Sequence, residues 1–294
     1  MCEPTNEFST PAHDCAEAHH VLALAAHHEG EVFASGSAVL VAPHLALTAR
    51  HVTEDFTQHF EGQAVCADGR ATFAILARGY FGGAWRMFDV LRTFNTAGTD
   101  VTALYLTPAC GEPADFVWPR VELDLLPPRT GRRVSTWGHI NPHASFSGPS
   151  QEAIHWYATL ARSSGTVGEI FPRERDSALV NYPAFHFDAR VDGSMSGGPV
   201  FDEHGRLVGI NTRSLPATAT DPVHTSTAAL MWPVPALPFA TDGETYPPNA
   251  DVQFIEDLHR LGFLSMLNHE AVRVDRATSP SELHVSVTIT GDRH

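Results

Sequence analysis

The feature that most constrains the fold is a long series of short β-type segments separated by turn residues. Segments such as Gly36–Val41, Val101–Leu106 and Arg206–Asn211 are rich in aliphatic residues and lie between Gly, Pro, Asn or Asp. Many short strands of this kind predict an all-β sandwich or barrel, because they do not alternate with helical segments as in an α/β fold. The Pro-Pro-Arg-Thr-Gly stretch at Pro127–Gly131 breaks the series, and we place a boundary between two β halves there.

The two ends of the chain differ from this pattern. Residues 1–30 are polar and rich in histidine, and we expect them to form an extension that ends in a short helix over Ala16–Ala26. Apolar residues recur at spacings of three and four over Asp251–Leu267, which predicts an amphipathic helix. Alternating apolar and polar residues then predict two further strands, Ala271–Val274 and Glu282–Thr290.

Charge and cysteine content exclude several classes. The chain has 34 acidic and 19 basic residues, a net charge of −15 that disfavours binding to nucleic acid or to an anionic membrane surface. The four cysteines are scattered without a CxxC pair, which argues against a disulfide framework or a cysteine zinc site. The N-terminal residues lack the basic and apolar segments of a secretory signal, so we expect a cytoplasmic protein.

Three residues in separate segments carry the chemistry: His51, Asp100 and Ser196. Each has an ordinary structural explanation when taken alone: a solvated histidine at a strand end, a turn aspartate and a serine in a tight turn. Their occurrence together, in the order His, Asp, Ser, favours a catalytic role. A serine hydroxyl needs an adjacent base to become a nucleophile, an imidazole suits that role near neutral pH, and a buried carboxylate fixes the imidazole tautomer. Gly197 and Gly198 permit a sharp turn that lets backbone amides face an oxyanion.

The residues of the motifs and their order along the chain resemble those of the trypsin-like (chymotrypsin-fold) serine peptidases, in particular the disulfide-free bacterial members of the Deg type. Thr48–His51 resembles the histidine motif of that family, with Arg50 as a departure, and Asp100–Leu106 resembles its aspartate strand. Ser196–Pro199 matches the nucleophile motif, and Gly209–Thr212 fits the Deg-type sequence that follows it. The resemblance covers roughly residues 31–240.

This resemblance implies a fold of two six-stranded antiparallel β-barrels, at residues 31–125 and 126–245, followed by a C-terminal helix and strands at 246–294. It implies a serine endopeptidase that cleaves proteins through an acyl-enzyme and needs no cofactor. Ser196 is the implied nucleophile, His51 the general base and Asp100 the carboxylate that orients it. The resemblance places the oxyanion hole at the segment Ser194, Met195 and Ser196.

One difference from the family pattern affects the expected catalytic activity. The family usually has glycine two residues before the nucleophile, where this chain has Ser194. The serine Cβ penalises positive-φ conformations by about 1–2 kcal/mol, so one hypothesis is that the oxyanion hole is poorly formed at rest and is organised by substrate or a partner. The rival hypothesis is that Ser194 takes an ordinary strand conformation and the hole is intact.

The substrate preference is less certain from sequence. Arg190 lies six residues before the nucleophile, at the implied base of the primary pocket, and Arg213 lies beside the expected substrate. Two arginines there favour an acidic substrate residue by charge-assisted pairing, unless they point to solvent or pair with Asp188 and Asp192. The segment expected to run beside the substrate consists of Asn211, Thr212, Arg213 and Ser214.

Alternative functions follow from the same observations. Ser194 and Met195 allow a peptidase-fold binding module with little turnover, or a protease that a partner activates. The segment after about residue 250 either docks on the second barrel or binds a regulatory protein. A metal site among His19, His20, His27 and His28 is a third hypothesis, but no HExxH motif accompanies these histidines, and solvated side chains explain them better. Asp89 is a weaker rival to Asp100.

Overall fold

The computed structural model describes residues 8–10, 15–60, 73–111, 116–147, 153–215, 224–239, 250–276 and 285–289, and every structural statement below concerns these residues.

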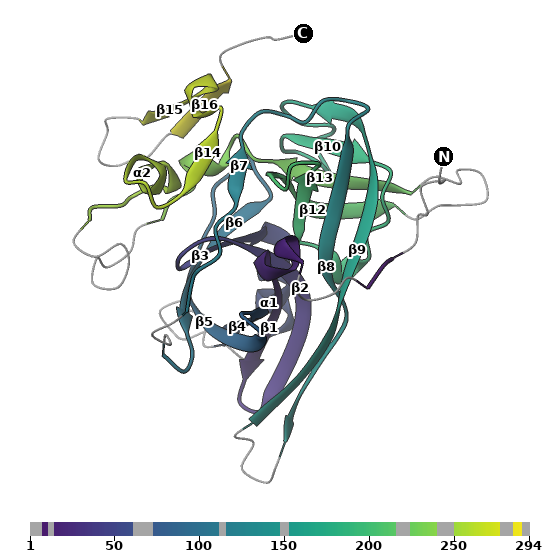
Figure 1. Cartoon of the computed structure of the whole chain (residues 1–294), viewed down its shortest axis with the longest axis vertical. Helices are drawn as coiled ribbons and strands as arrows, with labels where there is room; N and C mark the ends of the chain where they lie inside the picture. Colours follow the sequence, from purple (N-terminus) through teal and green to yellow (C-terminus); the bar gives the residue numbers. More distant parts are fainter. Residues whose placement is uncertain are drawn as a thin grey trace.

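The N-terminal half forms a closed barrel of six strands in which every neighbouring pair is antiparallel. The strands around the barrel, in spatial order, are β1 (Val21–His28), β2 (Glu31–Ala42), β3 (Leu45–Ala49), β6 (Val101–Pro108), β5 (Ala84–Phe94) and β4 (Ala74–Phe81). Small and aliphatic side chains such as Leu24, Leu40 and Leu104 are fully buried in its interior. The barrel is the purple and blue part of Figure 1.

The C-terminal half closes a second ring of six antiparallel strands, because β11 pairs with both β8 and β12. Its strands in spatial order are β8 (Arg133–Ser147), β9 (Ala153–Phe171), β10 (Ala184–Phe187), β13 (Thr225–Leu230), β12 (Leu207–Leu215) and β11 (Pro199–Asp202). The short strands β7 (Glu122–Asp124) and β14 (Ser265–Leu267) extend the sheet beyond β12 through parallel pairing. The predicted all-β fold with two six-stranded barrels is confirmed.

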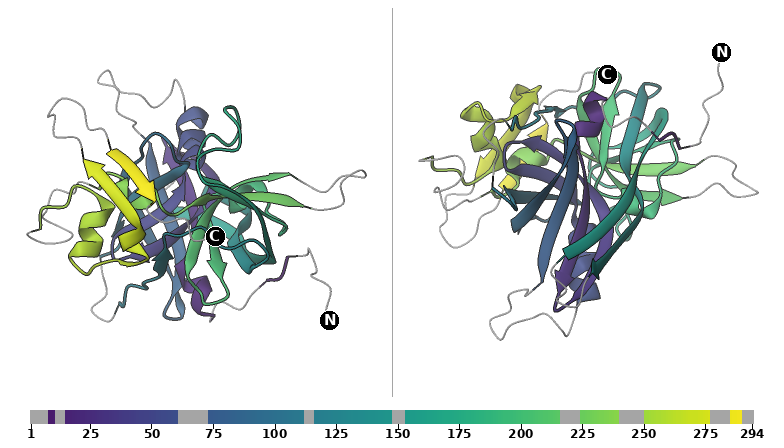
Figure 2. Two further views of the ribbon diagram at one scale, coloured as in Figure 1. Left: turned by 90° about the horizontal axis from the view of Figure 1, so that it is seen from above. Right: turned by 60° about the horizontal axis from the view of Figure 1, so that its bottom comes forward.

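The hairpin of β8 and β9 is longer than its barrel requires. It runs past the second barrel and along the first, as the teal ribbons in Figures 1 and 2 show. Its pairing register shifts between Ile140 and His143, where Asn141 has a left-handed φ of 50°. Trp156 of β9 is buried against Ala23, Ala25 and Leu76 of the first barrel, in an apolar cluster of their own. The hairpin therefore contributes a second contact between the two halves.

The predicted helix over Ala16–Ala26 is wrong. A single 3₁₀ turn spans Ala16–His20, and the residues that follow form β1. The apolar run Val21–Ala26 is buried throughout, because β1 lies between β2 and β4 in the barrel wall. A short continuous apolar run does not distinguish a buried strand from a buried helix by periodicity. The first barrel thus begins at Val21 rather than at residue 31.

The predicted C-terminal helix is also too long. The helix α2 spans only Ile255–Arg260, and the chain then turns at Gly262, whose φ of 79° is the left-handed conformation that commonly ends helices. The last part of the predicted helix forms β14 instead. The two predicted strands that follow are present as an antiparallel pair, β15 (Val272–Arg276) and β16 (Val285–Ile289).

This C-terminal segment is docked onto the body of the protein. Ile255 and Leu258 of α2 are fully buried in the apolar cluster that also contains the first-barrel core, and Met266 of β14 belongs to the same cluster. The segment is yellow in Figures 1 and 2, on the side of the first barrel away from the β8–β9 hairpin. These buried residues are therefore used for packing within the chain.

Helices are few and short in the described part of the chain. The longest, α1, spans Arg50–His59. No helix among the described residues has the length and apolar content needed to cross a membrane. Cys15 and Cys110 form no disulfide within the described part of the chain, and the other two cysteines, Cys2 and Cys66, lie outside it.

Candidate active site

His51 and Asp100 are brought together by two neighbouring strands of the first barrel. His51 is the second residue of α1, which begins directly after β3, and Asp100 directly precedes β6. Because Ala49 of β3 pairs with Val101 of β6, the two side chains emerge at the same edge of the barrel. The His51 Nδ1 lies 2.9 Å from the Asp100 Oδ2, and the His51 backbone N–H donates to the Oδ1 at 3.2 Å. One carboxylate thus fixes both the backbone and the ring of His51.

Ser196 lies on the loop between β10 and β11 of the second barrel, and this loop is tied to the first barrel. The Ser37 backbone N–H donates to the Ser196 carbonyl at 2.7 Å, and the Ser37 hydroxyl donates to the Ser194 carbonyl at 2.9 Å. The same hydroxyl accepts the His139 backbone N–H at 2.9 Å. Ser37, which is fully buried, is therefore a positioning residue that sequence reasoning missed, although it stands beside the left-handed Gly36 in a segment rich in strand residues.

Gly197 sets how closely the serine loop approaches the first barrel. It has a φ of 83°, and a Cβ at this position would overlap the Thr48 hydroxyl and the Ser37 carbonyl. Only glycine fits this approach, because other residues strain at positive φ and fill the space that the neighbouring chain occupies. The Ser196 backbone is consequently held against the strand that leads into His51.

Of the two hydrogen bonds expected in a Ser–His–Asp triad, only the one between His51 and Asp100 is present among the described residues. His51 and Asp100 are hydrogen-bonded, whereas the Ser196 hydroxyl makes no hydrogen bond within the described part of the chain. Catalytic hydrogen bonds are often long in the absence of substrate and tighten when it binds. Asp89, the weaker rival for the carboxylate, lies on β5 opposite Leu76 of β4, and Asp100 is the acid that contacts His51.

The segment predicted to form the oxyanion hole is folded into a 3₁₀ turn over Gly193–Met195. The Met195 N–H donates to the Asp192 carbonyl at 2.9 Å, and the Ser196 N–H donates to the Gly193 carbonyl at 3.2 Å. Ser194 is not among the residues with positive φ, so its Cβ carries no left-handed strain in this conformation. The Ser196 N–H thus donates to a carbonyl of its own loop. In a formed oxyanion hole this N–H would be free to donate to the substrate oxyanion.

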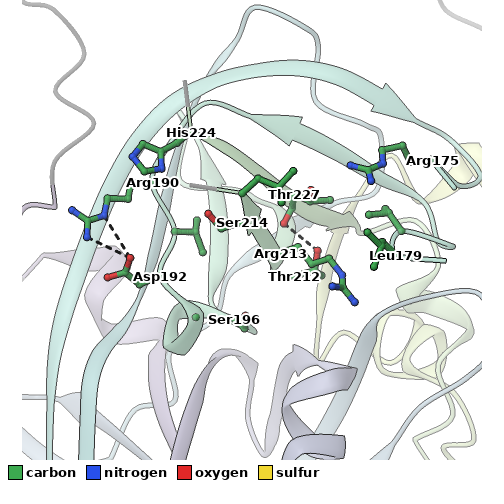
Figure 3. Close-up of a pocket in the computed structure, with 14 residues that line it drawn as sticks. Arg175, Leu179, Arg190, Asp192, Ser196, Thr212, Arg213, Ser214, His224 and Thr227 are labelled. Atoms are coloured by element: carbon green, nitrogen blue, oxygen red, sulfur yellow. Dashed lines mark hydrogen bonds and ion pairs between the residues drawn. The ribbon is translucent and has the colours of Figure 1, made fainter. Parts of the chain in front are cut away.

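A cavity of about 700 Å³ opens beside Ser196 (Figure 3). Four of the predicted substrate-binding residues line it, namely Arg190, Thr212, Arg213 and Ser214. Sequence reasoning missed other residues of its wall: Arg175, Leu179 and His224. The Arg175 guanidinium is paired with Asp176 at 2.8 Å.

Asn211 is the exception among the predicted substrate-binding residues. It has no exposed surface, and its side-chain amide donates to the Thr136 hydroxyl. Its backbone holds the serine loop, because the Gly197 N–H donates to the Asn211 carbonyl at 2.8 Å and the Asn211 N–H donates to the Gly198 carbonyl at 2.9 Å. Its contacts position the nucleophile loop, and the expectation that it contacts substrate is corrected.

The two predicted arginines of the cavity differ in their surroundings. The Arg190 Nε lies 3.5 Å from the Asp192 Oδ1, and its guanidinium lies over the Phe8 ring at 4.2 Å. Arg213 is exposed and has no ion-pair partner among the described residues. It lies near Tyr182, whose pKa is raised to about 12, first by burial and then by the charge of Asp100. Arg213 is thus the more available cation of the pair.

The histidines that suggested a metal site do not share one face. His19 and His20 precede β1, and His27 and His28 end it, so the strand separates the two pairs along its length. Their proposed grouping assumed a helix, which this segment does not form. Within the described ranges, no group of three or more histidine, cysteine or acidic residues is placed to hold a metal ion.

The two barrels, with a His–Asp pair on one and a serine loop from the other, define a chymotrypsin-like fold. The chain matches the trypsin-like peptidase domain family over residues 36–210, and it belongs to that family. It is therefore a peptidase of the trypsin-like serine class, for which the substrates are proteins or peptides.

Solved structures that are similar to the chain include the following three. One is the crystal structure of Deg5, with a TM-score of 0.48 and 17% identity, covering 74% of this chain and 85% of that one. A second is the MamO protease domain from Magnetospirillum magneticum, with a TM-score of 0.43 and 18% identity, covering 74% and 94%. A third is a Glu endopeptidase, with a TM-score of 0.48 and 11% identity, covering 76% and 91%. No curated protein matches the chain in sequence.

Proposed function

We propose that this peptidase is an endopeptidase that cleaves protein or peptide bonds through an acyl-enzyme on Ser196. The observation that carries the proposal is the His51–Asp100 hydrogen bond of 2.9 Å at the edge of the first barrel, against which Ser37 and Gly197 hold the serine loop. The Asp100 carboxylate accepts the Nδ1–H of His51, which leaves the Nε2 as a base directed to the other side of the ring.

In the proposed reaction the Ser196 hydroxyl attacks the substrate carbonyl while the His51 Nε2 takes its proton. The imidazolium that forms is stabilised by Asp100 and then gives its proton to the departing amine. Water, activated by His51 in the same way, hydrolyses the resulting ester and restores the Ser196 hydroxyl. These steps move protons and acyl groups only and need no cofactor.

The proposal requires a change in the serine loop before turnover. The Ser196 N–H must leave the Gly193 carbonyl in order to donate to the oxyanion, which means that the peptide between Gly193 and Ser194 rotates. Loss of one oxyanion donor lowers kcat by about 10²–10³. We therefore propose that the resting conformation has low activity and that substrate or a partner protein shifts the loop.

A fluorophosphonate probe tests the proposed nucleophile directly. We expect wild-type protein to gain one phosphonyl adduct per chain and peptide mapping by mass spectrometry to place it on Ser196. An adduct on another residue, or hydrolysis of a peptide substrate by protein that carries no reactive serine, would contradict the assignment.

A second candidate function is a binding module with little turnover. It is favoured by the occupied Ser196 amide and by the Ser196 hydroxyl that makes no hydrogen bond within the described residues. Labelling and turnover separate the two functions. If neither wild type nor a variant with a freed loop labels or cleaves, and a peptide still binds, the binding module is the better description.

Replacing Ser194 with glycine is expected to raise kcat/KM by about 5- to 30-fold, because glycine removes a Cβ penalty of about 1–2 kcal/mol on positive-φ conformations of the loop. The same substitution should speed fluorophosphonate labelling. Steady-state assays on one peptide substrate measure the change. Ser265→Gly, in an exposed position of β14 remote from the loop, is the matched control and should leave kcat/KM unchanged. Turnover that is unchanged or lower in Ser194→Gly would favour an intact oxyanion hole in wild type.

Arg213 is expected to favour acidic side chains in the cavity. Arg213→Gln should lower kcat/KM for a Glu-containing peptide by about tenfold while leaving the matched Gln-containing peptide nearly unchanged, because a charge-assisted hydrogen bond contributes about 1.5–3 kcal/mol. A library of peptides varied near the scissile bond supplies the comparison. Arg190→Gln should have a smaller effect, since Asp192 already neutralises Arg190. No preference for Asp or Glu at any position would exclude this interpretation.

A further inference from the structure

A second cavity, of about 400 Å³, lies where the β8–β9 hairpin crosses the first barrel. Its wall combines residues of β1, β4 and β5 with residues of the hairpin: Ala23, Arg78, Trp85, His139, Asn141, Trp156, Tyr157, Ala158 and Thr159. None of these residues lines the cavity beside Ser196. The hairpin is the long pair of teal strands in Figure 1. This cavity is therefore separate from the candidate active site.

The charge of the second cavity is opposite to that of the protein as a whole. The chain carries a net charge of −15, but no acidic residue lines this cavity, and its one charged residue is Arg78. The Arg78 guanidinium lies over the Trp85 ring at 4.3 Å and donates one hydrogen bond to the Trp156 carbonyl. Within the described residues no carboxylate forms an ion pair with it. Burial lowers the pKa of Arg78. A half-buried cation without a counter-ion favours an anionic ligand.

Trp156, one of the residues that line the cavity, has an unpaired hydrogen-bond donor. Trp156 is 4% exposed, and its indole Nε1 is buried without a hydrogen-bond partner among the described residues. Buried indole N–H groups usually find an acceptor, and leaving one unpaired has a cost. Because neighbouring atoms cover this N–H, the Arg78 guanidinium is the donor that the cavity itself presents.

The remaining surface indicates the body of the ligand. Trp85 and Tyr157, which line the cavity, are 39% and 64% exposed, and Ala23 and Ala158 add small apolar side chains to the wall. Cavities of this volume accept small organic molecules, with mostly apolar walls and a few polar groups that fix orientation. A single guanidinium balances the one charge of a carboxylate but only half the charge of a phosphate dianion, and its paired N–H groups fit the two carboxylate oxygens.

We propose that the cavity between the first barrel and the β8–β9 hairpin binds a carboxylate attached to an aromatic or branched apolar group. Arg78 pairs with the carboxylate, and Trp85 and Tyr157 flank the apolar part. A free organic acid and the C-terminal residue of a peptide present this same chemistry. The proposal concerns binding alone and does not depend on turnover at Ser196.

Isothermal titration calorimetry of the full chain with N-acetyl-phenylalanine tests the proposal, with N-acetyl-phenylalanine amide as the uncharged counterpart. We expect the acid to bind at least about tenfold more tightly than the amide, because the amide cannot form the charge-assisted pair. The peptide Ala-Ala-Phe, compared with its C-terminal amide, shows whether a chain terminus is accepted as well as a free acid. Binding of inorganic phosphate as tight as that of the acid would overturn the carboxylate class.

Variants locate the binding. Arg78→Gln should weaken binding of the acid by about 10- to 100-fold, because it removes the charge that pairs with the carboxylate. Arg132→Gln, at an exposed arginine that lines neither cavity, is the matched control and should leave binding unchanged. Arg78→Lys keeps the charge and should retain part of the affinity if Arg78→Gln proves unstable by circular dichroism. Binding that is kept in Arg78→Gln, or no preference for acid over amide, would overturn the proposal.

Discussion

Replacing Ser196 with alanine is expected to lower kcat on a peptide substrate by on the order of 10⁵- to 10⁶-fold and to abolish fluorophosphonate labelling. The reason is that the proposed acyl-enzyme has no other oxygen to form on, since the His51–Asp100 pair by itself supplies a base but no nucleophile. A fluorogenic peptide assay measures the loss. Substrate binding, measured by calorimetry, should remain, because the alanine leaves the cavity wall in place.

Asp100→Asn is the companion variant. Its effect distinguishes the role of Asp100, which orients the base, from the role of the nucleophile Ser196. The amide disturbs the His51 tautomer without moving the loop, so kcat should fall by about 10⁴ while labelling becomes slow rather than absent. Circular dichroism should show native folding for both variants. Retention of most activity in Ser196→Ala would contradict the proposed mechanism, and so would full activity in Asp100→Asn.

Gly197→Ala is expected to lower the free energy of unfolding by about 2–5 kcal/mol, a large part of the stability of a typical domain. Two costs combine: about 1–2 kcal/mol for an L-residue at a φ of 83°, and about 1–3 kcal/mol for forcing a methyl group into the Thr48 hydroxyl and the Ser37 carbonyl. Chemical denaturation monitored by tryptophan fluorescence measures the change. The same variant should lose activity, since the loop can no longer approach the first barrel.

Gly205→Ala is the control for this prediction. Gly205 has a similar φ of 75°, but nothing lies within 4 Å of the position of its Cβ. It should therefore show only the backbone strain, about 1–2 kcal/mol. The difference between the two variants measures the overlap at the junction of the barrels. Equal destabilisation by both would mean that the contact of Gly197 with Thr48 and Ser37 adds nothing.

Ser37 connects the geometry of the loop to its activity. Its hydroxyl holds the Ser194 carbonyl, and its backbone N–H holds the Ser196 carbonyl, so the loop is fixed on both sides of Met195. The peptide between Gly193 and Ser194 is not held by these bonds, and its carbonyl occupies the Ser196 N–H. A ligand shifts the equilibrium between two loop conformations only by as much as its affinities for the two conformations differ. Substrate that binds only when the Ser196 N–H is free would supply this preference.

The sequence predicted regular features more reliably than their ends. The short β segments predicted an all-β fold in two halves, because strand patterns follow from burial of one or both faces, and the family resemblance implied that each half is a six-stranded barrel. The run Val21–Ala26 was predicted as a helix and forms a strand, since an entirely apolar run has no period to detect. Residues Asp251–Leu267 were predicted as one helix, but Gly262 ends the helical turn and the following residues pair with β7.

The sequence by itself determined the family, the all-β architecture and the candidate residues His51, Asp100 and Ser196, because motifs and periodicity are local properties of the chain. Only the tertiary structure decided that the Ser196 amide is taken by Gly193, that Asp192 neutralises Arg190, and that Arg78 and Trp156 meet at a second cavity. The first feature depends on the rotation of one peptide, the second on side-chain conformations within one loop, and the third on contact between distant segments. None of these leaves a periodic pattern in the order of the residues.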